Sequence, residues 1–504
     1  MKTQLSFANL AEIETELLAV AAADTQTSKA PEAKPELLLL TADEAVQAAA
    51  TVVLASGEYK AGANETLLLH APAGLLAKRL LIVGLGKQAK ATVNSVRNAA
   101  GTAVRFTKPR GIRELVFALP ELELWSAAHS ARAAVEGAFV GDFDPDIYRS
   151  DRKDQSVRSF TLAASGNSDQ DALKAAFAEG VIVGESQNFT RSLVNEPGNK
   201  LTPTILGHCA AHMADEVGLK WAVYSTDKLH ELKMGAFWSV SQGSEEPPAL
   251  IVLRYEPEGV PADSAGPVLG LVGKGITFDT GGISIKPSDK MEQMKYDMAG
   301  GAAMIGAMRA IALLKPKVRV IAVVCAAENM PSGSAQKPGD VQPAMSGKTI
   351  EVINTDAEGR MVLADGLTYA KQLGATHLID AATLTGACVV ALGMTNAGVF
   401  SNDDNTYAKF EGALATSGEN FWRLPLGEEY AELIKSDIGD IKNTGGRYGG
   451  AITAAEFLKV FVEDTPWIHL DIAGLAWVEE NKPYIAKGPS GVAVRSILEW
   501  VRSY

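Results

Sequence analysis

The sequence predicts an α/β protein of two α/β domains, whose C-terminal domain has a central, mostly parallel or mixed sheet with helices on both faces. Its 504 residues are more than a single hydrophobic core normally serves. Short apolar runs alternate with longer stretches of helical spacing, which is the rhythm of an α/β fold. We therefore expect an N-terminal domain over residues 1–168, a connecting helix over 169–194 and a C-terminal domain over 195–504.

The N-terminal part alternates in this way up to residue 164. Its expected strands lie at 36–40, 51–54, 79–83 and 159–164, and its expected helices at 93–106 and 125–139. Residues 21–36 are small, polar and interrupted by proline, and this composition predicts an exposed loop or insertion. The amphipathic stretch 169–194 ends at the helix-stopping sequence Asn195-Glu196-Pro197-Gly198, so we expect it to join the two domains.

The C-terminal part repeats the alternation to its end. Expected strands lie at 249–254, 268–272, 318–324, 350–353, 377–381 and 389–392, and the main expected helices at 298–314 and 361–373. In a sheet with helices on both faces, functional groups gather at the carboxyl ends of the strands. We therefore look for the site where charged residues follow these apolar runs.

Composition limits the classes of function. The formal net charge of −13 disfavours a nucleic acid or an anionic membrane as partner, because binding them needs a basic face. The cysteines (Cys209, Cys325 and Cys388) match no zinc or disulfide spacing, which favours a reducing compartment. Acidic residues at 12, 14 and 16 interrupt any signal-peptide core, and no run of about eighteen apolar residues could span a bilayer. We expect a soluble, cytoplasmic protein.

Two acids and a base stand close together in the segment 354–360, directly after the apolar run 349–353. They are Asp356, Glu358 and Arg360. Carboxylates at the end of a buried strand are unfavourable unless positive charge pairs with them, and one arginine cannot balance both. A metal ion could supply the missing charge.

A second cluster lies upstream. Lys274 and Asp279 follow the apolar run 268–272, Lys286 comes next, and Asp297 precedes the helix expected at 298–314. Taken alone, Asp297 could be a helix N-cap and each lysine a solvated surface residue. Together the clusters place four carboxylates at the edges of buried elements, about the charge that two neighbouring divalent cations need. Such ions act as Lewis acids and lower the pKa of a bridging water to about 7.

Other motifs are weaker candidates. His208 and His212 have the i, i+4 spacing of a metal pair, but without a glutamate motif or a third ligand we expect ordinary helix residues. The glycines at 84 and 86 lack the rest of a dinucleotide loop, and Gly273-Lys274-Gly275 lacks the rest of a P-loop. No Gly-x-Ser-x-Gly nucleophile elbow stands in a strand–helix setting.

The two clusters closely resemble the leucyl, or cytosol, aminopeptidase family of di-metal exopeptidases, which includes the bacterial aminopeptidase A proteins. The resemblance rests on NTDAEGR at 354–360 and on the segment that begins VGKGITFDTGG at 272, and it extends over about residues 185–500. Further matching stretches are SLVNEPGNKLTP (192–203), AENMPSGSAQKPGDV (327–341), AATLTGA (381–387), SDIGDIKNTGGR (436–447) and HLDIAGLAW (469–477).

The resemblance implies a ligand set for two divalent ions, with manganese or zinc favoured. The implied side-chain ligands are Lys274, Asp279, Asp297, Asp356 and Glu358. Asp279 and Glu358 would bridge both ions. Lys274 and Asp297 would serve the more loosely held ion, and Asp356, with its backbone carbonyl, would lean towards the tighter one. A lysine ligand must be neutral, which a nearby dication and desolvation make possible.

The resemblance also implies the reaction. Lys286 would polarise the scissile carbonyl and stabilise the oxyanion, and Arg360 would hold a bicarbonate-like anion that accepts the proton of the metal-bridged water. The first side chain of the peptide would lie in an apolar pocket formed by Met294, Thr383, Gly386 and Ala473. The expected substrates are peptides with a free N-terminal amine, with leucine and other apolar residues preferred. The resemblance further implies a homohexamer.

Two other classes of function compete with this interpretation. A two-metal phosphoesterase would also gather carboxylates, but it would need more basic residues to meet the phosphate oxygens. DNA binding is a secondary role in some bacterial relatives, yet the acidic net charge and the lack of a basic arm or helix–turn–helix disfavour it.

Overall fold

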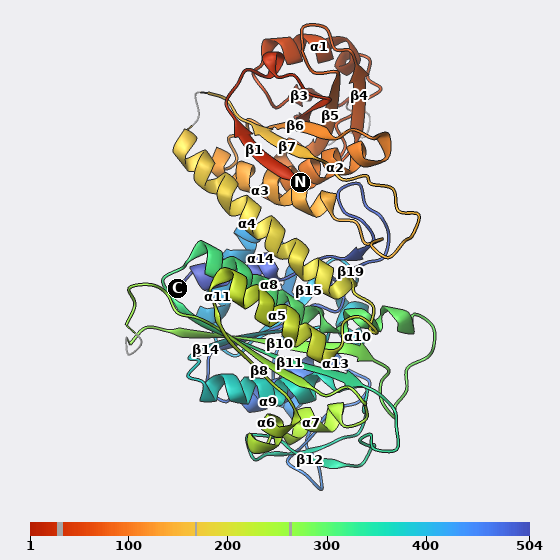
Figure 1. The fold of residues 1–504 in the computed structure, drawn as a ribbon, viewed down its shortest axis with the longest axis vertical. Helices are drawn as coiled ribbons and strands as arrows, with labels where there is room; N and C mark the ends of the chain where they lie inside the picture. The colour runs from red at the N-terminus through yellow and green to blue at the C-terminus, as the bar shows by residue number, and fades with distance from the viewer. Residues whose placement is uncertain (28–33, 167–168, 262–264) are drawn as a thin grey trace. The chain divides into compact units, whose positions relative to one another are not determined.

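The computed structural model describes residues 1–27, 34–166, 169–261 and 265–504. Its backbone divides into two compact units (Figure 1). Unit 1 comprises Met1–Asn188 and Glu479–Gly488, and unit 2 comprises Phe189–Val478 and Pro489–Tyr504. Each unit is a sheet covered by helices, so the predicted fold class of two α/β domains is confirmed.

Unit 1 has a mostly parallel sheet in the order β1-β7-β6-β2-β5-β4. The strands are β1 (Lys2–Ser6), β2 (Leu17–Asp24), β4 (Thr66–His70), β5 (Arg79–Lys87), β6 (Glu114–Ala118) and β7 (Ser159–Ala163), with β3 (Leu37–Leu39) paired to β2. Only β3 and β4 run antiparallel to their neighbours. Helices α2 (Val93–Thr107) and α3 (Ala127–Asp142) pack on one face, and α1 (Glu44–Ala55) contributes to the core on the other.

Two predictions for unit 1 are wrong. The run 51–54 is not a strand but the last turn of α1, which begins after Asp43, whose side chain accepts a hydrogen bond from the amide of Val46. This N-cap and the alanine-rich helix outweigh the strand preference of the valines. Residues 21–24 are not an exposed loop but the end of the central strand β2, where they are buried. The part of that predicted loop at 28–33 lies outside the described residues.

Unit 2 has a mixed sheet in the order β16-β15-β18-β14-β10-β11-β9-β8. The strands are β8 (Lys220–Tyr224), β9 (Ala249–Tyr255), β10 (Val268–Asp279), β11 (Arg319–Asn329), β14 (His377–Ala382), β15 (Ala397–Ser401), β16 (Phe421–Arg423) and β18 (Trp467–Asp471). The four central strands, β18, β14, β10 and β11, are parallel. Their carboxyl ends therefore meet at one edge of the sheet.

Helices cover both faces of this sheet (Figure 1). The helices of unit 2 are α5 (Pro203–Val217), α6 (Thr226–Glu231), α7 (Gly235–Ser241), α8 (Ala299–Leu314), α9 (Gly359–Gln372), α10 (Gly386–Leu392), α11 (Asp404–Ser417), α12 (Glu428–Glu432), α13 (Gly450–Val462) and α14 (Val494–Arg502). The boundary between the units falls within α4 (Gln170–Asn195). Two neighbouring residues of β10 show that helices cover both faces. A Cβ on Gly273 would meet Gly301 of α8, whereas the side chain of the preceding residue, Val272, lies against Gly366 of α9. Successive strand residues thus point to α8 and α9 on opposite faces.

Two predictions for unit 2 are also wrong. The run 389–392 lies in α10, where the Thr385 side chain caps the helix by accepting a hydrogen bond from the Cys388 amide. The run 350–353 forms only the short strand β13 (Thr349–Glu351), and this strand does not belong to the central sheet. It pairs with β12 (Val341–Pro343) and β17 (Ile441–Lys442) in a sheet of its own. The length and apolar content of a predicted strand do not reveal which other strands it pairs with.

One described helix, Met291–Leu314, is long and apolar enough to cross a membrane. It consists of the 3-10 segment η4 (Met291–Met298) and α8. Within the structure 83% of its apolar window is buried, as in a core helix. Its apolar character is therefore explained by packing on the central sheet.

Helix α9 is fixed in place by a buried carboxylate. Asp365 has no exposed surface, and its two oxygens accept hydrogen bonds from the backbone amides of Phe237 (2.8 Å) and Met345 (2.7 Å). Burial raises the pKa of Asp365 to about 7, which these backbone donors partly oppose. The residue joins α9 to α7 and to the loop after β12.

We predict that Asp365→Ala destabilises the chain. The backbone amides of Phe237 and Met345 would lose their acceptor, and each unpaired buried donor typically costs about 1–3 kcal/mol. Urea unfolding of the wild type and the variant measures the difference. Asp365→Asn keeps one acceptor oxygen and should lose less stability than the alanine variant, whereas equal stability of all three proteins would contradict this role.

Candidate metal centre

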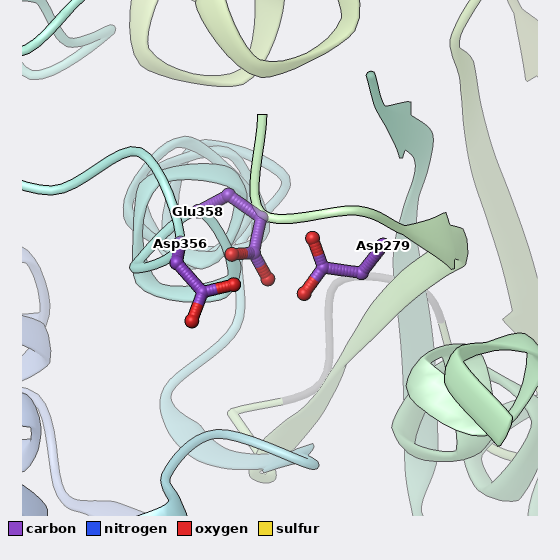
Figure 2. A group of neighbouring side chains, drawn as sticks. All are labelled: Asp279, Asp356 and Glu358. Atoms are coloured by element: carbon purple, nitrogen blue, oxygen red, sulfur yellow. The ribbon is translucent and has the colours of Figure 1, made fainter. Parts of the chain in front are cut away.

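The predicted ligands converge at the carboxyl edge of the unit 2 sheet. Asp279 is the last residue of β10, and Asp297 is the next-to-last residue of η4, shortly before α8. Asp356 and Glu358 lie in the turn that leads into α9. Figure 2 shows the carboxylates of Asp279, Asp356 and Glu358 facing one another, and one candidate ligand oxygen from each lies within 4.8 Å of the others. Among the described residues no other group of three such side chains is found.

Two lysines lie among these acids. The Lys274 ammonium is 2.7 Å from Asp297 Oδ2 and 2.8 Å from Glu358 Oε1, and it donates to the Thr383 carbonyl at 3.0 Å. The Lys286 ammonium is 2.8 Å from Asp279 Oδ2 and also pairs with Asp356 Oδ1. Lys274 is buried, whereas the Lys286 side chain is 22% exposed. Lys286 can therefore meet a substrate at the surface of the cluster.

Glycine is required where the chain passes close to the cluster. Gly281 has φ +88°, and a Cβ there would lie 2.9 Å from Asp356 Oδ1. Gly359 begins α9 against the Lys274 side chain, where a Cβ would lie 2.7 Å from the nearest lysine carbon. A side chain at either position would displace a charged group, which explains the glycines after Asp279 and after Glu358.

Neutral side chains orient the acids. Asp279 Oδ1 accepts hydrogen bonds from Asn329 Nδ2 and from the Gly281 amide, both at 2.8 Å. The Thr383 hydroxyl donates to Asp297 Oδ1 at 2.7 Å. Asn329 ends β11 and Thr383 follows β14, so the strands that neighbour β10 supply these donors.

Negative charge exceeds positive charge in the cluster, and the pKa values reflect this. Burial raises the pKa of Glu358 to about 7, and the Asp279 carboxylate adds to the shift. Burial also raises the pKa of Asp356 to about 6, again with help from neighbouring carboxylates. Burial would lower the pKa of Lys274, but Asp297 and Glu358 outweigh it and hold that pKa above its ordinary value. Additional cationic charge would therefore be stabilised here.

The donor set fits divalent cations. Glu358 Oε2 is buried and has no hydrogen-bond partner among the described residues, which is an unfavourable state for a carboxylate oxygen. Carboxylate oxygens are ligands that manganese, magnesium and zinc all accept. An ion bound between these acids would satisfy the oxygen and offset the charge.

Arg360 lies in the first turn of α9 and is buried. Its Nη1 donates to the Asn443 carbonyl at 2.7 Å, while its buried Nε has no hydrogen-bond partner among the described residues. Burial lowers the pKa of Arg360 to about 10, so it remains cationic at neutral pH. An unpaired guanidinium N–H next to a metal centre can bind an anion.

The residues expected to line an apolar pocket come from three segments. Met294 is half-buried in η4, Thr383 and Gly386 follow β14, and Ala473 follows β18. Asp471, at the end of β18, brings two of these segments together. Its Oδ1 accepts from the Leu384 and Ala473 amides, and its Oδ2 accepts from the Thr385 hydroxyl at 2.6 Å.

Sequence reasoning did not single out Asn329, Asn443 or Asp471. Each lies inside a stretch that resembles the family, and this resemblance was the one feature of the sequence that could have pointed to them. Apart from Ala473, which bonds Asp471, the partners named for them are remote along the chain, so no local pattern marks these residues. Both histidines of the i, i+4 pair lie on α5, and His212 Nδ1 lies 3.7 Å from Glu216, with its side chain 79% exposed.

Comparisons with known proteins cover nearly the whole chain. The profile "Cytosol aminopeptidase family, catalytic domain" matches residues 188–498, and that of the N-terminal domain of the same family matches residues 24–152. A probable cytosol aminopeptidase of Acidobacterium capsulatum is 64% identical over 508 residues, covering 100% of both chains. One of Koribacter versatilis is 60% identical with the same coverage.

Solved structures of other proteins are similar to this chain over nearly its whole length. A mutant of tomato leucine aminopeptidase superposes with a TM-score of 0.87 at 33% identity, covering 100% of this chain and 97% of that one. The bottromycin maturation enzyme BotP in complex with manganese superposes with a TM-score of 0.83 at 34% identity, covering 97% of this chain and 99% of that one.

Proposed function

The chain belongs to the cytosol aminopeptidase family, whose members are metal-dependent exopeptidases, and from that premise we propose how its own residues carry out the reaction. The proposed reaction is release of the N-terminal residue, preferably leucine or another apolar residue, from peptides with a free amine. The observation that carries this proposal is the convergence of the Asp279, Asp356 and Glu358 oxygens within 4.8 Å.

Two divalent ions, manganese or zinc, are the proposed cofactors. The residues that would hold them are Lys274, Asp279, Asp297, Asp356 and Glu358. Asp279 and Glu358 are proposed to contact both ions. Lys274 would give up its proton on binding, because the incoming cation replaces the counter-charge that its ammonium now provides to Asp297 and Glu358. When bound, such ions polarise a carbonyl and make a water acidic enough to act as a nucleophile near neutral pH.

Lys286 is proposed to stabilise the oxyanion of the scissile carbonyl. It pairs with Asp279 and Asp356, so its ammonium is held at the edge of the proposed ion site, and its partial exposure leaves it open to a substrate. A fixed cation in a partly dry site stabilises charge that develops in the transition state, at no reorganisation cost.

Arg360 is proposed to bind a bicarbonate-like anion that accepts the proton of the attacking water. Its Nη1 donates a hydrogen bond to the Asn443 carbonyl, which fixes the guanidinium. Its Nε has no hydrogen-bond partner within the described part of the chain. A guanidinium suits an oxyanion with two acceptor oxygens.

The proposed pocket for the first side chain consists of Met294, Thr383, Gly386 and Ala473. A Cβ on Gly386 would meet no atom within 4 Å, so space exists beside this residue. Small and apolar groups favour an aliphatic side chain over a charged one.

We further propose that the protein forms a homohexamer in the cytoplasm. Residues 195–504 would be the catalytic domain, and residues 1–168 would have an oligomeric or regulatory role. The net charge of −13 disfavours nucleic acid as a partner.

We predict that the protein hydrolyses leucine p-nitroanilide but not its N-acetylated analogue, because the proposed site recognises a free α-amine. A chelator should abolish the activity, and manganese or zinc should restore it. The release of p-nitroaniline measures each rate. Equal cleavage of both compounds, or activity that survives removal of metal, would contradict the proposed function.

We predict that Asp279→Asn removes bound metal and activity together, since this carboxylate is proposed to serve both ions. Metal content is measured by mass spectrometry after dialysis against manganese. The control is Asp289→Asn, which makes the same change at an exposed residue of the segment between β10 and η4. Full metal content in the Asp279 variant would refute its shared role.

We predict that Lys286→Ala keeps its metal but loses turnover, because loss of one oxyanion donor typically lowers kcat by about 10²–10³-fold. Steady-state kinetics and metal content are measured on the same sample. Lys337→Ala, at a lysine whose side chain is 68% exposed, serves as the control for loss of a charge. A kcat equal to that of the wild type would remove Lys286 from the mechanism.

A further inference from the structure

Asn443 holds the segment that carries two of the proposed ligands. The residue has no exposed surface and follows β17 directly. Its Oδ1 accepts from the Ile353 amide at 2.8 Å and from the Asn354 amide at 3.3 Å. Its Nδ2 donates to the Asn354 carbonyl at 2.7 Å and lies 3.5 Å from the Ala357 carbonyl. One side chain thus contacts both ends of the turn that contains Asp356.

The main chain of Asn443 contacts the same region. Its amide donates to the Glu351 carbonyl at 2.9 Å, and its carbonyl accepts from Arg360 Nη1 at 2.7 Å. The segment from Glu351 to Arg360 is therefore bonded to Asn443 before, within and after the turn.

The Asn443 side chain continues the hydrogen bonding between the paired strands β13 and β17. β13 and β17 pair in parallel, and the last paired residues are Glu351 and Lys442. The strand pairing ends there, and the next residue, Val352, bonds the backbone of Gly339 and Asp340 instead. A carboxamide offers one donor group and one acceptor, like a peptide group, so the Asn443 side chain continues the ladder where the backbone cannot.

This bonding bears on the acids directly. Asn354 Oδ1 accepts from the Asp356 amide at 2.9 Å, so fixing the Asn354 backbone also fixes the start of the turn. Ala357, the other contact of the carboxamide, stands between the two acids. Ligand groups must be held to within about 0.5 Å of productive geometry, and the residues that hold them decide this.

We propose that Asn443 is a positioning residue, which sets the placement of Asp356 and Glu358 for the ions and of the Arg360 guanidinium for its anion. This inference rests on the proposed function, since it assumes that these acids bind metal. It assigns to the β17 loop a role in the metal affinity of a turn about ninety residues away along the chain. A purely structural role would affect stability but not metal affinity, and this difference can be measured.

The test compares Asn443→Leu with a matched control, Asn402→Leu. Asn402 also bonds only backbone groups in unit 2. Its Nδ2 donates to the Thr465 carbonyl at 3.0 Å, and its Oδ1 accepts from the Trp467 amide at 2.8 Å. Trp467 begins β18, whereas the acids lie at the carboxyl edge of the sheet. Leucine has the same number and branching of side-chain heavy atoms as asparagine, with somewhat bulkier methyl groups, and it removes the side-chain hydrogen bonds in both cases.

Manganese is titrated calorimetrically into chelator-treated full-length protein, and thermal unfolding is recorded in parallel. We expect Asn443→Leu to bind manganese about 10–100-fold more weakly than the wild type, as is typical when a group supporting a ligand is lost. At saturating manganese its kcat should still be reduced, because the main-chain carbonyl of residue 443 that accepts from Arg360 is no longer tied to the turn by the side-chain hydrogen bonds. Asn402→Leu should lower the melting temperature without changing the affinity for manganese.

Three outcomes would overturn the inference. Unchanged manganese affinity in Asn443→Leu would make the residue merely structural, and equal weakening in both variants would make the effect one of global stability. A wild type that binds no manganese would instead refute the proposed function, and with it the premise. If the leucine variants do not fold, Asn443→Ser and Asn402→Ser carry the same comparison, because serine introduces no apolar group but cannot span the turn.

Discussion

The gathering of four carboxylates, three of them buried, at one edge of a sheet is the constraint on which the rest of unit 2 depends. Asp279, Asp297 and Glu358 are almost fully buried, and Lys274 and Lys286 lie among them as counter-charges. Excess negative charge in a desolvated site is unfavourable, and it appears as raised pKa values in Asp356 and Glu358. Cations would stabilise such a site, so the acid cluster and its proposed ions account for each other.

The surrounding fold serves to hold these charges at short range. Parallel strands β10, β11, β14 and β18 end together, which brings Asp279, Asn329, Thr383 and Asp471 to one edge. Glycines at the turn after β10 and at the start of α9 let the backbone approach the charged side chains. The Asp471 carboxylate and the Asn443 carboxamide then fix two loops by bonding to their backbone amides. The cluster is thus supported from several separate segments of the chain.

Much of this could be predicted from the sequence, for identifiable reasons. Asp279 ends a strand of the central sheet, so its place at the carboxyl edge could be predicted from the strand pattern. The 356–358 turn was singled out because its acids follow an apolar run, although that run lies outside the central sheet. Two of the wrong strand predictions share a cause. Runs 51–54 and 389–392 have strand-like side chains, but capping by Asp43 and Thr385 makes them helices. The supporting residue Asn443 bonds partners about ninety residues away, a distance at which no periodicity reports contact.

The central claim is that the acid cluster holds two divalent ions. Anomalous diffraction from crystals grown with manganese tests it most directly, because the signal locates each ion without assuming its ligands. The account predicts two anomalous peaks among Asp279, Asp297, Asp356 and Glu358, with Asp279 and Glu358 next to both. A single peak, or peaks that lie away from these carboxylates, would contradict it.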